Sequence, residues 1–317
     1  MSEPVLIAEN LTQEYVLKGG MFGKDRIVRA LSGASFSLEP GKTLAVVGES
    51  GCGKSTLARC ITMIEEPVSG SFVLNGKKAT AANHDELRTT VQIVFQDPYG
   101  SLNPRQRCGQ ILEEPLIINH PDMPADERTR RAREMLELVG LRPEHYDRYP
   151  HMFSGGQRQR IAVGRALMLE PKVLVLDEPV SALDLSIQSQ ILNLLVDLQE
   201  RLGLAYLFIS HDLSVVKHIA DEVIVMYLGR PVEVASKEAL FEHQRHPYTK
   251  ALLSATPMAD PTLRKQRIKL TGELPSPVDI PPGCPFSPRC WKATDKCRAE
   301  RPELDQGDHR AACHFPE

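Results

Sequence analysis

The chain alternates between short apolar runs and amphipathic segments of helical length. Five runs rich in Val, Ile, Leu and Phe predict strands at 43–48, 91–95, 173–177, 205–210 and 222–228. Segments with apolar residues at helical spacing predict helices at 54–64, 125–139, 157–169, 186–202 and 213–220. Three of the strands are apolar almost throughout, as expected of a parallel sheet covered on both faces. We therefore expect an α/β fold built from βαβ units.

Two regions depart from this alternation. Residues 5–38 hold short β-type runs interrupted by glycines, which predicts an antiparallel flap. Ten of the 24 prolines lie in residues 256–317, so turns dominate there. We expect a main domain over 1–255 and a small, cysteine-rich loop domain over 256–317.

Composition narrows the class of protein. The 317 residues carry 38 Lys+Arg against 41 Asp+Glu, for a net charge of −3, which argues against a strongly basic nucleic-acid-binding protein. No apolar run approaches the roughly 18 residues that a membrane span needs. Residues 1–10 lack the basic start and long apolar stretch of a secretory signal. We expect a soluble, cytoplasmic protein that binds no nucleic acid and meets a membrane only through partners.

A phosphate-binding loop is the first chemical signal. Residues 48–55 read GESGCGKS, which fits G-x-x-x-x-G-K-[ST] between a predicted strand and a predicted helix. The glycines let backbone N–H groups point inward, and the helix N-terminus adds partial positive charge. Lys54 can reach the β- and γ-phosphates of ATP, and the Ser55 hydroxyl can ligate Mg²⁺. The residues expected to contact ATP here are Gly48, Glu49, Ser50, Gly51, Cys52, Gly53, Lys54, Ser55 and Thr56.

Two carboxylates follow another apolar strand. The segment VLVLDEP at 173–179 places Asp177 and Glu178 at the carboxyl end of a buried strand. We expect Asp177 to hold the Mg²⁺ shell and Glu178 to polarise the water that attacks the γ-phosphate.

A second anion-binding helix start lies at FSGGQRQR, residues 153–160. A single nucleotide has no use for two such loops from one chain. We therefore expect a sandwich dimer in which each ATP contacts the phosphate loop of one subunit and the second loop of the other. The residues that would contact ATP across the dimer in this way are Ser154, Gly155, Gly156 and Gln157.

With these motifs in order, residues 5–250 resemble the ATP-binding subunits of ABC transporters. The resemblance implies a P-loop NTPase fold of the ABC ATPase type, with a RecA-like parallel sheet, an antiparallel β flap and a helical subdomain at about 97–165. It also implies that Gln96 contacts Mg²⁺ and water and senses the membrane partner. Asp184 would lie across the dimer interface, and His211 would hydrogen-bond the γ-phosphate. Glu178, His211, Lys54 and Gln96 would then be the catalytic group.

An aromatic residue in the flap is the candidate for stacking on adenine. Tyr15 is our choice, because an aromatic face adds contact area and geometry. Phe22 is the available alternative.

Three further segments narrow the family. Residues 95–105 (FQDPYGSLNPR), 246–257 (HPYTKALLSATP) and 272–290 (GELPSPVDIPPGCPFSPRC) resemble the dipeptide/oligopeptide importer group, which includes nickel importers, and the whole chain resembles the second ATPase subunit of bacterial dipeptide importers. The resemblance implies a homologous second ATPase subunit, two transmembrane permease subunits and an extracytoplasmic peptide-binding protein. The chain would then lie on the cytoplasmic face of the bacterial inner membrane, with the 96–105 loop against a permease helix.

Several alternatives stay open at this point. The solute could be nickel, haem or another small molecule, and the partner ATPase could be a copy of this chain. An ABC-type ATPase of DNA repair or chromosome maintenance is disfavoured, because only 98 residues separate Ser55 from Ser154 and they contain no heptad run. A non-hydrolysing module is disfavoured because Glu178 and His211 are both present.

Four cysteines gather at the end of the sequence, with the spacing C-x5-C-x6-C-x15-C. A cytoplasmic protein rarely keeps structural disulfides, so a metal site is the first interpretation. The paired knuckles of zinc ribbons are absent, which favours a four-iron four-sulfur cluster over Zn²⁺, with no metal as the third possibility. The proposed ligands are Cys284, Cys290, Cys297 and Cys313.

Overall fold

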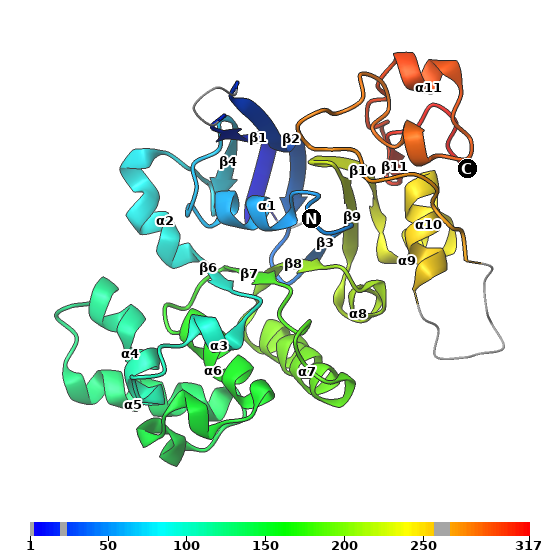
Figure 1. Cartoon of the computed structure of the whole chain (residues 1–317). Helices are drawn as coiled ribbons and strands as arrows, with labels where there is room; N and C mark the ends of the chain where they lie inside the picture. Colours follow the sequence, from blue (N-terminus) through cyan, green and yellow to red (C-terminus); the bar gives the residue numbers. More distant parts are fainter. Residues whose placement is uncertain (1–2, 20–23, 257–266) are drawn as a thin grey trace.

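The computed structural model describes residues 3–19, 24–256 and 267–317. Its centre is a seven-stranded sheet (Figure 1) in the order β11-β10-β9-β3-β8-β7-β6. The parallel part runs from β9 (Glu222–Tyr227) through β3 (Thr43–Val47), β8 (Ala205–Ser210) and β7 (Val173–Asp177) to β6 (Val91–Val94). All five strands predicted from apolar runs are confirmed, with ends that agree within one residue.

Both faces of this sheet are covered, because alternate side chains enter different cores. Along β8, Tyr206 and Phe208 join one hydrophobic cluster, while Leu207 and Ile209 join another on the opposite face. The first cluster is completed by α6 (Gly155–Leu167) and α7 (Leu185–Leu202), and the second by α1 (Lys54–Ile61). A third cluster includes side chains of α8 (Leu213–Ile219) and β9.

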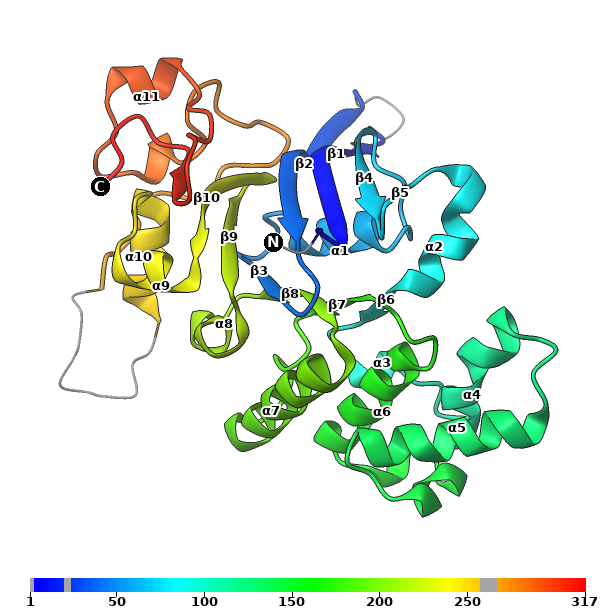
Figure 2. The ribbon, with the colours of Figure 1, turned by 180° about the vertical axis from the view of Figure 1, so that it is seen from behind.

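The predicted flap is a four-stranded antiparallel sheet in the order β2-β1-β4-β5. It consists of β1 (Leu6–Leu17), β2 (Arg26–Leu38), β4 (Ser69–Leu74) and β5 (Lys77–Lys78). The last two strands come from a region where the sequence pattern predicted no strand. In both views the flap lies over α1, on the opposite side of the main sheet from α7 (Figures 1 and 2).

A group of helices is inserted between β6 and β7. It contains α3 (Pro98–Ser101), α4 (Cys108–Asn119), α5 (Ala125–Leu138) and α6, and it extends below the sheet in both views (Figures 1 and 2). Two 3₁₀ turns, Pro143–Asp147 and Pro150–Met152, link α5 to α6, while Ala81–Asn83 and α2 (His84–Thr90) precede β6. The predicted helices appear with small shifts; α1 stops at Ile61 because Met63 turns into the left-handed region at φ 56°.

The remaining elements lie beyond β9. Strand β10 (Arg230–Ser236) turns back antiparallel and leads into α9 (Lys237–Glu242) and α10 (Pro247–Ala255). Residues 267–317, here called the tail, contain a 3₁₀ turn at Ser287–Arg289, helix α11 (Asp295–Ala299) and strand β11 (Arg310–Ala311). Since β11 pairs with β10, the tail is joined to the main sheet.

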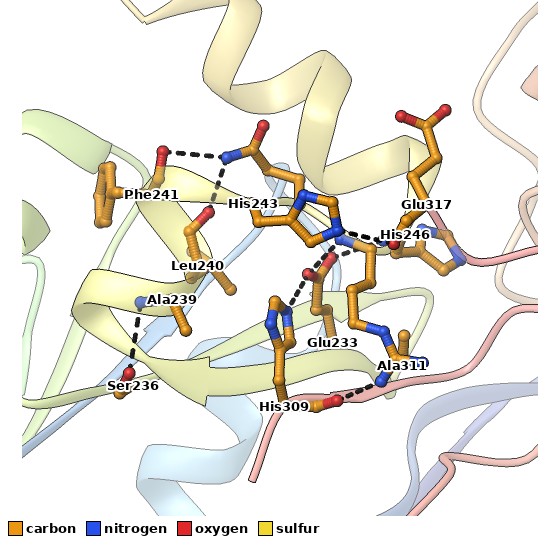
Figure 3. Close-up of polar contacts among 12 residues, drawn as sticks. Glu233, Ser236, Ala239, Leu240, Phe241, His243, His246, His309, Ala311 and Glu317 are labelled. Atoms are coloured by element: carbon orange, nitrogen blue, oxygen red, sulfur yellow. Dashed lines mark hydrogen bonds and ion pairs between the residues drawn. The ribbon is translucent and has the colours of Figure 1, made fainter.

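A buried carboxylate fixes this junction. Glu233 of β10 is fully buried and accepts hydrogen bonds from the backbone N–H groups of Arg245 and His246, at 2.8 and 2.9 Å. The His309 imidazole reaches the same carboxylate from the tail, at 2.7 Å (Figure 3). One side chain therefore holds together β10, the start of α10 and the tail.

No helix among the described residues is long and apolar enough to span a membrane.

Candidate nucleotide-binding site

The phosphate loop connects β3 to α1 and requires glycine at two points of close approach. A Cβ at Gly48 would overlap the Met226 carbonyl of β9, and a Cβ at Gly53 would overlap the Ala30 carbonyl of β2. Both residues also have positive φ, at 152° and 103°. The loop is therefore packed between the main sheet and the flap.

The loop closes around the ammonium of Lys54. This side chain is buried, and its Nζ donates to the carbonyls of Gly48 at 2.9 Å and Glu49 at 3.1 Å. The single buried ammonium of this loop thus lies at the place where the motif predicts phosphate binding.

The expected magnesium ligands lie side by side. The Ser55 hydroxyl donates to Asp177 Oδ1 at 3.3 Å, from the first turn of α1 to the end of β7. Burial raises the pKa of Asp177, and the hydrogen bond from Ser55 opposes that rise. A hydroxyl and a carboxylate are oxygen donors of the kind that Mg²⁺ prefers, so these two residues fit the ion.

Glu178 is held in a conformation that few non-glycine residues adopt. Its φ is 49°, and its backbone N–H donates to the Ile209 carbonyl of β8 at 3.0 Å. Its carboxylate oxygen Oε2 lies 3.0 Å from His211 Nδ1 and accepts a hydrogen bond from Gln96 Nε2 at 3.0 Å. The loops that follow β6, β7 and β8 therefore converge on one carboxylate oxygen, as expected at the carboxyl edge of a parallel sheet.

Most of these groups line one cleft of about 540 Å³, although Asp177 is not among the residues that line it. The sequence predicted most of its lining, namely Ser50, Gly51, Gly53, Lys54, Ser55, Thr56, Gln96, Glu178 and His211. Sequence reasoning missed Val28 and Ala30 of β2 and Pro277 of the tail. These three residues are far in sequence from the motifs that form the rest of the cleft, so no local sequence pattern marks them as part of it.

The aromatic candidate lies at the flap, outside the set of described residues that line the cleft. The Tyr15 hydroxyl donates to the Glu65 carboxylate, and burial together with that carboxylate raises the pKa of Tyr15. Tyr15 is paired in the sheet with Val28, which does line the cleft. Stacking on adenine stays a prediction. Phe22 lies outside the described residues.

The second loop is built as a helix start, away from this cleft. The Ser154 side chain caps α6 by accepting the Gln157 N–H at 3.4 Å, and the Gln157 side chain accepts the Ser154 N–H at 3.1 Å. A Cβ at Gly156 would overlap the Ile187 side chain of α7. Asp184 is the N-cap residue of α7. The second loop and Asp184 thus belong to neighbouring helix starts, while their contact with a nucleotide in a dimer stays a prediction.

The four tail cysteines all line one enclosed cavity of about 10 Å³, together with His246, Phe286 and Phe315. That volume is about the room of one water molecule. Burial raises the pKa of Cys284 to about 11, and it also raises the pKa of Cys290 and Cys313. No group of His, Cys, Asp or Glu side chains within the described ranges is arranged to hold a metal ion. The structure therefore does not support the predicted iron–sulfur site, because the thiols gather without leaving room for a cluster.

Together, the parallel sheet, the phosphate loop and the Gln96–Glu178–His211 group define a nucleotide-binding ATPase domain. The family model described as "ABC transporter" matches residues 31–181, and the model described as "Oligopeptide/dipeptide transporter, C-terminal region" matches residues 232–297.

Whole-chain relatives agree with these matches. The chain is 61% identical to the dipeptide transport ATP-binding protein DppF of Haemophilus influenzae, over 96% of this chain and 93% of that protein. It is 57% identical to DppF of Escherichia coli, over 99% and 95%. Among solved structures, it resembles the dimeric ATP-binding cassette MJ0796 bound to ADP and Pi, with TM-score 0.64 and 28% identity over 73% of this chain and 98% of that one. The chain belongs to the ATP-binding proteins of the ABC transporter family, in the dipeptide/oligopeptide group.

Proposed function

We propose that this chain is the ATP-hydrolysing motor subunit of an ABC importer for dipeptides and oligopeptides. The observation that carries this proposal is the convergence of Gln96 and His211 on Glu178 beside the phosphate loop. A module that only binds ATP has no need for a carboxylate oriented in this way. The near full-length identity to dipeptide transport ATP-binding proteins supports the substrate class.

The residues of the site have different roles in hydrolysis. Lys54 and the backbone of the phosphate loop bind the phosphates, and Ser55 and Asp177 hold Mg²⁺, which offsets the phosphate charge. Glu178 accepts a proton from the attacking water, while His211 and Gln96 fix the position of its carboxylate. The Glu178 side chain is only 16% exposed, so the surrounding residues restrict its movement away from Gln96 and His211.

The second loop acts in trans. The Ser154–Gln157 helix start and Asp184 contact the ATP that a facing subunit binds, so that two nucleotides join the two ATPases. The dimeric state of MJ0796 with ADP and Pi supports this arrangement. Closure requires ATP to favour the joined state, because a ligand shifts an equilibrium only by its differential affinity. Hydrolysis and phosphate release then reopen the dimer and move the permeases.

We infer the remaining partners and the location from the family to which the chain belongs. The facing subunit is a homologous second ATPase, and the complex includes two membrane permeases and an extracytoplasmic peptide-binding protein. The chain lies on the cytoplasmic face of the inner membrane. The groove beside Phe95, Pro115 and Ile118 supports a permease contact, since Phe95 and Ile118 are 40% and 70% exposed. The proposed domains are 1–255 and 256–317.

The tail cysteines carry a separate proposal, that they bind a metal group, either a four-iron four-sulfur cluster or Zn²⁺. All four thiols line one cavity, which brings the proposed ligands together but leaves no room for the group in the present conformation. Binding of the metal group would require the sulfurs to move outward, because the cavity holds about one water. The role of the metal group would be to stabilise a segment that has little hydrophobic core of its own.

Transport assays test the main proposal. A strain that lacks this subunit should lose uptake of a labelled dipeptide and regain it with the wild-type chain. The Glu178→Gln chain should assemble without restoring uptake. Loss of nickel or haem uptake with intact dipeptide uptake would instead favour the alternative solutes.

A further inference from the structure

The tail contacts the nucleotide site at two separate places, one on the phosphate loop and one on the wall of the cleft. Arg289 forms two hydrogen bonds with the Glu49 carboxylate of the phosphate loop, Nη1–Oε2 at 2.8 Å and Nη2–Oε1 at 3.1 Å. Further along the cleft, Pro277 forms part of the wall, and its carbonyl accepts the Arg29 N–H of β2 at 3.3 Å. The orange segment beside β2 in Figures 1 and 2 follows this path.

Glu49 is held from three directions. Its N–H donates to the Tyr248 hydroxyl at 2.9 Å, its carbonyl accepts Lys54 Nζ at 3.1 Å, and its carboxylate accepts Arg289. Gly48 and Gly51 flank this position with positive φ. The contacts of Glu49 therefore hold the loop at a point between two glycines, where the backbone itself is least restricted.

The pair of Arg289 and Glu49 has the environment of a specific contact. The Arg289 side chain is 10% exposed and that of Glu49 is 29% exposed. The two parallel bonds fix direction as well as distance, because the guanidinium and the carboxylate are both planar. Phe286, three residues before Arg289, packs against the rings of Tyr227 and Tyr248 with centroids 5.4 Å away. The arginine is thus anchored on a rigid aromatic base.

We propose that Arg289 is a positioning residue of the nucleotide site. By holding Glu49 it keeps the phosphate loop in the conformation that binds ATP, which makes the tail a working part of this subunit's own site. The inference rests on the proposed ATPase function and adds a residue outside the motifs.

Binding of Mg·ATP to the full chain tests this role, in the Glu178→Gln background so that no turnover intervenes. Arg289→Met should raise the Kd about tenfold or more, because Glu49 is left with an unpaired, partly buried charge. Arg289→Lys should give a smaller rise, since an ammonium cannot form the two parallel bonds. The double variant Glu49→Gln/Arg289→Met should have a Kd for Mg·ATP no higher than that of the single variant with the higher Kd. Arg298→Met is the matched control, because Arg298 is a tail arginine whose side chain is 62% exposed and forms an ion pair with Asp295.

Hydrogen exchange of the backbone amides at 49–55, measured without ATP, supplies a second readout. Arg289→Met should speed this exchange and Arg298→Met should not. If Arg289→Met does not fold, the same measurements are made on Arg289→Lys and Tyr248→Phe. The Tyr248→Phe variant removes the hydroxyl that accepts the Glu49 N–H. A lower thermal midpoint with unchanged Kd and unchanged exchange would overturn the positioning role. If the parent chain fails to bind Mg·ATP, the proposed ATPase function fails, and the exchange difference still decides this inference.

Discussion

Glu178 Oε2 lies 3.0 Å from His211 Nδ1, although the two residues are 33 positions apart in sequence. The glutamate is 16% exposed while the histidine is 57% exposed. The carboxylate that we propose as the general base is therefore sheltered, while its imidazole partner is exposed. This arrangement suits a site that is completed by a second protein surface.

Replacing Glu178 by Gln should lower ATP turnover at least a hundredfold, because the amide keeps the shape of the side chain but cannot accept the water's proton. Binding of Mg·ATP should remain. Phosphate release and ATP binding, measured on the same preparation, check both parts. Glu200→Gln on the exposed face of α7 is the control and should turn over normally. Normal turnover by Glu178→Gln would refute the assigned role.

Gly156→Ala should destabilise the start of α6, because the added methyl overlaps the Ile187 side chain of α7. We expect the free energy of unfolding to fall by about 1–3 kcal/mol. The double variant Gly156→Ala/Ile187→Ala should lose less than the sum of the two single losses, since truncation makes room for the methyl. Urea unfolding of the four chains measures this, and strict additivity would contradict the proposed overlap.

Acid should weaken the fold through His246. Burial lowers its pKa to about 3, from an ordinary value of 6.5, and its Nδ1 accepts the Tyr248 N–H at 3.1 Å. Between these two pH values the unfolded chain binds more protons than the folded chain. The free energy of unfolding should therefore fall as pH drops below about 6.5, by at most about 1.4 kcal/mol per pH unit from this group.

A variant that cannot titrate isolates this contribution. Asn at position 246 can still accept the Tyr248 N–H with its side-chain oxygen, so His246→Asn should show a shallower pH dependence between pH 4 and 6.5. Chemical unfolding at a series of pH values gives both curves. Parallel curves for the two proteins would show that His246 does not titrate on unfolding.

If the tail binds the proposed metal group, protein purified without oxygen should contain it. We expect about four irons and four sulfides per chain, or about one zinc for the alternative site, and loss of the metal in Cys284→Ser. Iron, acid-labile sulfide, zinc and visible absorption measure these together. Cys60→Ser is the control, because Cys60 is buried in a different core. Absence of both metals would refute the metal proposal.

The sequence patterns predicted those elements of the fold that are determined by their own local sequence. Continuous apolar runs identified β3, β7 and β8, because both faces of these strands are buried. Strand β10 was missed, since Pro231 and Glu233 interrupt its pattern and the buried Glu233 acts as an anchor. The cleft was predicted from motifs and from family resemblance. The pairing of Arg289 with Glu49 was not, because the two residues are 240 positions apart and neither is unusual in its own surroundings.

The pairing of β11 with β10 also determines which pieces of the chain can be studied separately. Strand β11 covers part of an edge of the main sheet, where Glu233 pairs with Ala311 and Val234 with Arg310. A fragment that ends at residue 255 would present this edge to other molecules, and open edges recruit further strands. It would also leave the buried Glu233 carboxylate without its imidazole. Aggregation of such a fragment would therefore report on an uncovered sheet edge, and it would say little about the competence of the nucleotide cleft.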